Sequence, residues 1–310
     1  MLTGDLLVMP KKKDIARQNI STDKKEFDAL KSYIQKAAVG SLRHHQRFSL
    51  CIKASLVKCY EFNNRIRDDK RSNDAFFLVP TLRGICEDLI VLNFIKRMPK
   101  ADREQLIELL MAHELYSRFE SQDKFFSKVR PQQPVLRAKD GDQVLADLKA
   151  KIQPIWIRHG WAGLGDKVMP PIRQLAQKQQ QPVLTGLYDY LYRLTSGSVH
   201  FNVQSLLRSG WGSKHRWVFS TVNFDQYFSA YGRVYGAFLF CVYFEFFGRF
   251  LRPGPKVTKR IDEIRKSLIF EPRWPEMVTF EEMNQKLPEM EIRRVLVTAI
   301  QAETIKRLMD

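Results

Sequence analysis

Apolar residues recur every three or four positions along most of this chain, which is the spacing of one face of an amphipathic helix. The first such segment extends from Asp23 to about Asp68, and Gly40 is its only interruption. This segment predicts either one long helix or two helices with a bend at that glycine.

Further segments have the same helical spacing and are separated by polar or Pro- and Gly-containing turns. They predict helices over residues 74–98, 102–128, 143–153 and 170–181. The third of these should end before Pro154, because proline interrupts a helix. The connection that follows is rich in glycine, and we expect Trp156 and Trp161 to pack beneath it. Residues 217–222 could form a short strand.

The most apolar helix is expected over residues 224–251. Only eleven uncharged residues separate Arg233 from Glu245, whereas a membrane-spanning helix needs about 20 apolar residues. A core helix is therefore favoured over a membrane helix. Three glycines in this segment would allow the close approach of a neighbour, such as a second copy of the protein: Gly232, Gly236 and Gly248.

Pro253, Gly254 and Pro255 end this helix and mark the best candidate boundary in the chain. The predicted fold class is all-α. The expected organisation is a basic flexible segment, a bundle of long helices and a small C-terminal helical extension, over residues 1–22, 23–252 and 253–310. The N-terminus has lysines after a short apolar patch, the reverse of a signal peptide, so a cytoplasmic protein is expected.

The composition of the chain shows a large excess of basic residues. The 310 residues include 51 Lys and Arg but only 34 Asp and Glu, which gives a formal net charge of +17. Such an excess favours a polyanionic binding partner, with nucleic acid as the first candidate and an anionic membrane surface as the second. The alternative is a solvated basic surface that binds no specific partner. The four cysteines lie in apolar helical patterns without a Cys-x-x-Cys pair, which indicates free thiols in a reducing compartment.

The stretch from residue 185 to residue 207 combines two stripes on one predicted helix. One stripe is apolar: Leu187, Leu191, Leu194 and Val199. The other is polar and falls near one meridian of an ideal helix, because seven residues almost complete two turns. Its members are Asp189, Arg193, Ser196 and His200. We take this stretch as the functional centre.

The usual cofactor motifs do not occur in the sequence. Cys, His and acidic residues are not clustered at metal-ligand spacing, and the Walker loop, the dinucleotide-binding glycine fingerprint and the Gly-x-Ser-x-Gly elbow are missing. No metal or cofactor is therefore predicted.

The pair that could carry chemistry is Arg193 with His200. Histidine titrates near neutral pH and can move protons, while the fork of donors on arginine suits a phosphate or a phosphorane. Metal-free RNA cleavage needs both abilities. The alternative is structural: His200 bonds to Ser196 or a carbonyl inside the core, and Arg193 pairs with Asp189.

The segment RLTSGSVH, residues 193–200, resembles the Arg-(four to six residues)-His signature of the HEPN superfamily. RGICEDL on an earlier helix also resembles an uncharacterised HEPN-like family that has an arginine and an acid on one helix. The resemblance spans about residues 27–250. It implies a helical bundle that is commonly dimeric and, in many members, a metal-independent ribonuclease of toxin–antitoxin or antiviral systems. Gly197-Ser198 departs from the pattern and favours a break before His200.

The resulting hypothesis is an all-α, HEPN-like homodimer that cuts RNA, with no membrane association and with an antitoxin or defence-complex protein as a further partner. Arg193 and His200 are the predicted catalytic residues. The predicted supporting residues are Ser196, Asp189, Tyr192, Arg83, Glu87 and Asn202. Arg83 and Glu87 either form a surface pair or face the 185–207 stretch. Two alternatives remain: a non-catalytic RNA- or protein-binding module, and a membrane-perturbing effector that uses residues 228–251.

Overall fold

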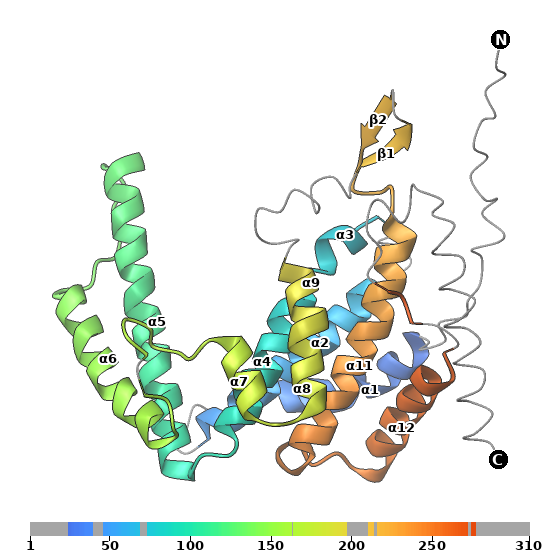
Figure 1. Ribbon diagram of the computed structural model, residues 1–310, viewed down its shortest axis with the longest axis horizontal. Coiled ribbons are helices and arrows are strands. Elements are labelled where there is room, and N and C mark those ends of the chain that lie inside the picture. Colours follow the sequence, from blue (N-terminus) through green and yellow to red (C-terminus); the bar gives the residue numbers. More distant parts are fainter. Residues whose placement is uncertain are drawn as a thin grey trace.

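A computed structural model gives the structure of the protein. It describes residues 24–39, 46–68, 73–162, 164–196, 210–213, 216–271 and 274–276. This described part is an all-α helical bundle with a two-stranded hairpin above one end and a pair of helices that extends to one side (Figure 1). The predicted fold class is confirmed. The N-terminal segment 1–22 and the last helices of the predicted extension lie outside the described residues.

The elements follow in chain order. The first half of the chain contains α1 (Lys24–Ala38), α2 (Arg47–Ile66), α3 (Ala75–Leu78), α4 (Thr81–Ile95), α5 (Lys100–Val129) and α6 (Gly141–Arg158). The second half contains α7 (Ile172–Lys178), α8 (Pro182–Gly186), η2 (Leu187–Tyr192), α9 (Arg193–Ser196), β1 (Gly210–Ser213), β2 (Arg216–Phe219), α11 (Asp225–Leu251) and α12 (Pro255–Phe270).

Helix α11 forms the centre of the core. Fourteen of its 27 residues are buried, as expected for a helix that is apolar around most of its circumference. Among the described residues α11 is the one helix long and apolar enough to cross a membrane, and 67% of its most apolar stretch is buried inside the bundle. This burial is what a core helix requires.

Two glycines let α11 approach α2 closely. A Cβ atom at Gly236 would lie 2.6 Å from Cε1 of Phe62, and one at Gly232 would lie 2.7 Å from Cγ1 of Ile66. The expected close approach of a neighbour is therefore confirmed for these two glycines, and the neighbour is α2 of the same chain and not a second copy. No described atom lies within 4 Å of a Cβ built at Gly248.

A buried polar contact fixes the same helix pair. The Asn63 side chain is fully buried, and its Nδ2 donates to the carbonyl oxygens of Gly236 at 2.9 Å and Cys59 at 2.8 Å. Its Oδ1 accepts from Nη1 of Arg67 at 2.7 Å. Because a buried amide without partners costs free energy, these bonds favour one register between α2 and α11.

Two predicted helical segments can be compared directly with the structure. Of the two alternatives for the first segment, two helices are confirmed, since α1 ends at Ala38 and α2 begins at Arg47. Helix α6 continues through Pro154 to Arg158, so the predicted end before that proline is wrong. The residues that follow it explain the continuation: Trp156 is fully buried, and its packing offsets the hydrogen bond that proline cannot make.

Helix α12 returns to the bundle after the turn at Pro253. Its buried residues belong to the same core as α11, and they are Ile261, Ile264 and Leu268. Nη1 of Arg260 donates to Oε2 of Glu26 on α1 at 3.1 Å. Residues 255–270 of the predicted extension therefore share the core of the bundle.

Helices α5 and α6 form an antiparallel pair that extends away from the bundle (Figure 1); we call this pair the arm. At its base, Asp102 of α5 accepts a hydrogen bond at 2.8 Å from Arg158, and it lies 2.8 Å from Nε2 of His159. The Trp156 indole donates to the carbonyl of Val168 at 2.9 Å. The expected packing of Trp156 and Trp161 is confirmed, because both are buried.

The predicted strand region forms a small antiparallel hairpin. β1 pairs with β2, and Gly210 is opposite Phe219 while Ser213 is opposite Arg216. The prediction of a strand near residues 217–222 is therefore confirmed in part, because the observed strand begins and ends earlier. The four cysteines are free, as expected.

Candidate functional site

The predicted central helix is not regular. Its described part, up to Ser196, consists of α8, then a π-helical segment over Leu187–Tyr192 (η2), then the turn of α9. A π-helix has hydrogen bonds from residue i to i+5 and more residues per turn than an α-helix. The ideal-helix alignment of Asp189, Arg193 and Ser196 is therefore wrong. Such π segments occur frequently at functional sites.

The structure brings Arg83 of α4 against this π-helical segment. Nη2 of Arg83 donates to the hydroxyl of Tyr192 at 3.1 Å, and its guanidinium carbon lies 5.1 Å from the centre of the Tyr192 ring. The two residues are 109 positions apart in sequence. Of the two interpretations of Arg83 and Glu87, the one in which they face the 185–207 stretch is confirmed for Arg83 alone. Within the described part of the chain, Arg83 and Glu87 form no ion pair.

Tyr192 is itself held in place by a neighbouring ring. The ring of Tyr188 stacks on it, with 4.9 Å between the ring centres and an angle of 21° between the planes. On the other side of the segment, Leu187 and Leu191 are buried in the core. The segment thus fixes one aromatic pair toward α4 and two leucines toward the bundle interior.

Beside Arg83 lies a shallow hollow of about 240 Å³ between α2 and the first turns of α4. It is lined by Lys58, Pro80, Thr81, Arg83, Gly84 and Glu87. Gly84 keeps the floor open, because a Cβ atom there would lie 2.9 Å from Nζ of Lys58. The hollow thus combines two cationic side chains with one carboxyl group.

Burial raises the pKa of the Glu87 carboxyl. The nearby charge of Asp88 raises this pKa further, while the positive charges of Arg83 and Lys58 lower it. A carboxyl group with a raised pKa can take up a proton more readily near neutral pH than an ordinary one. Such a shift is typical of, though not restricted to, functional sites.

Sequence reasoning missed Lys58, which lines this hollow, and Asp88, which pairs with it. Nζ of Lys58 donates to Oδ2 of Asp88 at 3.0 Å, and the same Asp88 oxygen accepts from the hydroxyl of Ser55 at 2.9 Å. The Ser55 hydroxyl also forms a short hydrogen bond with the hydroxyl of Tyr243 on α11. Asp88 stands next to Glu87 in the sequence, so the adjacent acids were the available signal. No sequence pattern links them to Lys58, because that contact is tertiary.

Arg193 and Asp189 both expose their side chains to solvent. No ion pair joins them among the described residues, so the structural alternative for Arg193 finds no support in this part of the chain. Ser196 is otherwise engaged: its hydroxyl donates to the carbonyl oxygen of Tyr192 at 2.7 Å. Thr195 makes the equivalent bond to Leu191, also at 2.7 Å. These bonds satisfy carbonyls of the π-helical segment.

Two predicted site residues, His200 and Asn202, lie outside the described residues. The structure therefore brings Arg83 into contact with Tyr192, with Glu87 one turn further along α4 and Arg193 on the turn that follows η2. In the described ranges, no three His, Cys, Asp or Glu side chains gather where they could hold a metal ion.

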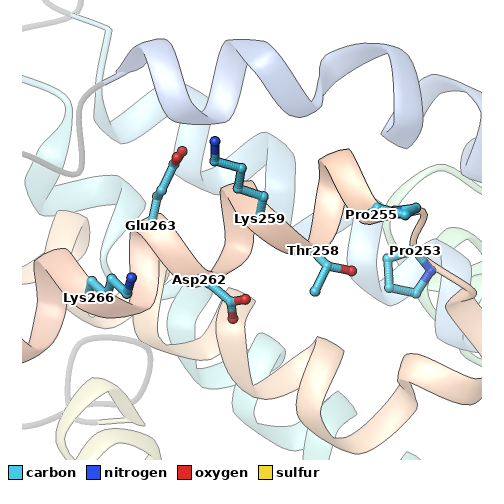
Figure 2. Close-up of a pocket in the computed structure, with 7 residues that line it drawn as sticks. All are labelled: Pro253, Pro255, Thr258, Lys259, Asp262, Glu263 and Lys266. Carbon is cyan, nitrogen blue, oxygen red and sulfur yellow. The ribbon is translucent and has the colours of Figure 1, made fainter.

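A second and larger hollow, of about 500 Å³, lies along α12. Figure 2 shows that its lining side chains come from one helix and the turn before it, and that they point to opposite sides of that helix. Glu263, one of them, already accepts a hydrogen bond at 2.7 Å from Arg260. The side chains do not converge on a common point, so this hollow is a weaker candidate than the one beside Arg83.

The fold and this site define a helical bundle with a hollow between α2 and α4 that contains two cationic side chains and one carboxyl group, and with Arg83 of its lining in contact with η2. Residues 78–214 match the model of a family described as "Family of unknown function (DUF5677)". The matched region contains Arg83, Glu87 and Tyr192, but it excludes Lys58 and all of α11. No curated protein and no solved structure gave a significant match.

Proposed function

We propose that this protein is an endoribonuclease that cleaves RNA without a metal ion, at the face where α4 lies against η2 and α9. The observation that carries the proposal is the contact between Arg83 and Tyr192. It places a guanidinium group from a distant helix next to the turn that begins with Arg193. The resemblance of residues 193–200 to the HEPN signature supports the same assignment.

Charge favours a polyanionic substrate at this face. Arg83 and Lys58 line the hollow, the exposed Arg193 follows on α9, and the whole chain carries a formal net charge of +17. Cationic side chains bind phosphates without regard to base sequence, and they position a strand along the protein. In the proposed complex, Arg193 contacts the phosphate that is cleaved and Lys58 contacts a neighbouring one.

The proposed reaction uses the 2′-hydroxyl of the RNA as nucleophile. His200 accepts the proton of that hydroxyl while the 2′ oxygen bonds to phosphorus. The bond from phosphorus to the 5′ oxygen breaks, this oxygen takes a proton from water, and the hydroxide that remains takes the proton held by His200. The products are a 2′,3′-cyclic phosphate and a 5′-hydroxyl. Arg193 stabilises the added negative charge on the phosphorane oxygens.

In this mechanism Arg83 is a positioning residue. It contacts Tyr192, which directly precedes Arg193, and so it fixes the end of η2 from which α9 begins. An Arg83→Lys substitution keeps the charge but loses the planar group that covers the Tyr192 ring. We expect it to lower kcat while leaving the salt dependence of RNA binding nearly unchanged.

The test is cleavage of total RNA by purified protein in EDTA, followed by analysis of the new termini. We expect cyclic phosphate ends on the products. His200→Ala and Arg193→Ala should each lower the cleavage rate by about 100-fold or more. Arg137→Ala is a matched control, since it removes an exposed arginine between α5 and α6 and should retain full activity. Intact RNA with the wild-type protein, or undiminished cleavage by His200→Ala, would overturn the proposal.

A non-catalytic RNA-binding module is the second candidate. The observation that favours it is the Ser196 hydroxyl, which donates to a backbone carbonyl and is therefore not a free donor beside Arg193. This candidate predicts salt-dependent RNA binding that persists in an Arg193→Ala and His200→Ala double variant, without any product. An antitoxin-like protein partner is expected only from the HEPN resemblance.

A further inference from the structure

The outer half of α5 exposes an apolar stripe. Four large apolar side chains there have relative exposures of 50–57%, and they are Met111, Leu115, Phe125 and Val129. At about 100° per residue, all four lie within roughly 40° of one meridian of the helix. Partly buried residues of the same stretch, such as Tyr116 and Asp123, lie on the other side. The four apolar side chains therefore face away from the rest of the arm and are largely exposed, while Gln122 between them donates to the carbonyl oxygen of Leu136 in the following loop at 3.2 Å.

The spacing of the stripe is symmetric about residue 120. Met111 and Val129 each lie nine positions from it, and Leu115 and Phe125 each lie five positions from it. Arg118 and Gln122, which complete the stripe, each lie two positions away. A second α5 that runs antiparallel across the first therefore meets it with the same residues on both sides, as a two-fold interface requires.

Charge also favours a second copy at this surface. Residues 111–129 contain three acidic residues (Glu114, Glu120 and Asp123) and three basic ones (Arg118, Lys124 and Lys128), so their formal net charge is zero. Arg118 pairs with Glu114 at 3.0 Å, and Lys124 pairs with Glu120. The rest of the chain carries the whole excess of +17. Two copies thus repel each other least where these two stripes meet.

We propose that a second copy of this chain docks on the α5 stripe in an antiparallel orientation, so that the two arms form a four-helix bundle. In this pairing Met111 packs on Val129 of the second copy, and Leu115 packs on Phe125 of the second copy. The interface is separate from the Arg83 and Arg193 region and does not depend on the proposed nuclease activity.

The size of the stripe sets the expected affinity. Its length is about 27 Å from the helical rise, and a helix is about 10 Å wide, so the footprint is on the order of 300 Å² per copy. Stable interfaces bury about 800 Å² per partner. The dimer is therefore a reversible one that dissociates on dilution.

Sedimentation velocity of the full-length, nuclease-treated protein over a range of concentrations tests the surface. The wild type should shift from monomer to dimer as concentration rises. Leu115→Glu and Phe125→Lys should each raise the dissociation constant at least 10-fold. The double variant should have a dissociation constant within a few-fold of the wild-type value. The introduced carboxylate of one copy would then face the introduced ammonium group of the other. Ile157→Glu is the matched control, since Ile157 is 57% exposed, a fraction close to those of Leu115 and Phe125, but lies on α6.

Cysteine cross-linking tests the antiparallel orientation. A mixture of Met111→Cys and Val129→Cys proteins should form a disulfide-linked dimer under mild oxidation, whereas each variant alone should not. Cross-linking of Met111→Cys with itself would indicate a parallel pairing and overturn the proposal. A wild type that stays monomeric, a dimer that Leu115→Glu leaves unchanged, or no cross-link in the mixture would overturn it as well. Circular dichroism verifies that each variant is folded.

Discussion

Helices α11 and α5 are similar in length but opposite in their surroundings. Helix α11 has 27 residues, of which fourteen are buried. Helix α5 has 30 residues, of which three are buried, and all three lie in its first eight positions. Both sequences contain many aromatic and aliphatic residues. The difference shows that apolar content alone does not say whether a helix forms the core of its own chain or presents a surface to another molecule.

The two helices also differ in their charges. Along α11 charged residues are sparse, and from Val234 to Phe244 there are none. The outer part of α5 alternates apolar residues with acidic and basic ones, and it pairs them along the helix, as Arg118 does with Glu114. Charges spaced in this way keep a helix soluble while its apolar stripe stays exposed. The core helix has no such requirement, because neighbouring helices cover it.

The largest effect should come from removing a core ring and comparing it with the same change on the arm. Phe240 is fully buried and packs at 5.2 Å from the ring of Phe27, whereas Phe125 is 55% exposed. Phe240→Ala should lower the free energy of unfolding by about 3–5 kcal/mol through lost burial and a cavity. Phe125→Ala should change it by less than about 0.5 kcal/mol. Urea denaturation of dilute protein measures both, and equal losses would contradict the comparison.

A smaller effect is expected from the glycines of α11. Gly236→Ala places a methyl group against Phe62 and Asn63 at under 3.0 Å, and we expect a loss of about 1–3 kcal/mol in stability. Gly248→Ala in the same helix meets no described atom within 4 Å. It should stabilise the protein by about 0.5–1 kcal/mol, since alanine favours the helix more than glycine does. A stabilising Gly236→Ala would show that α2 and α11 can separate without cost.

The smallest effect concerns the base of the arm. Hydrogen bonds from Arg158 and His159 lower the pKa of Asp102 below its ordinary value of 3.8. An acid with a lowered pKa stabilises the folded state above its unfolded pKa, and this contribution disappears as the pH falls through the folded pKa. Asp102→Asn should therefore cost about 1 kcal/mol at pH 7.

The difference in the free energy of unfolding between the wild type and Asp102→Asn should decrease as the pH falls below about 4. Denaturation curves measured between pH 7 and pH 3 give this difference directly. Asp28→Asn serves as the control, because Asp28 on α1 is exposed and forms no ion pair with the residues that the structure describes. A difference that stays constant over the whole range would show that the ionised Asp102 carboxylate is not what holds the arm.

The sequence alone determined where most helices lie. The spacing of apolar residues is local information, and a period near 3.6 specifies both the type of element and the face that it buries. The predicted helices 224–251 and 102–128 agree with α11 and α5 to within two residues at each end. The free cysteines and the packed Trp156 and Trp161 were predicted from the same kind of pattern.

Only the tertiary structure decided which groups meet and where local rules are overridden. Helix α6 passes through Pro154 because buried neighbours hold it, and Leu187–Tyr192 forms a π-helix that no periodicity predicts. The contact between Arg83 and Tyr192 joins residues 109 positions apart. Such contacts depend on how whole helices pack against one another, and the pattern within a single helix contains no information about its distant neighbours.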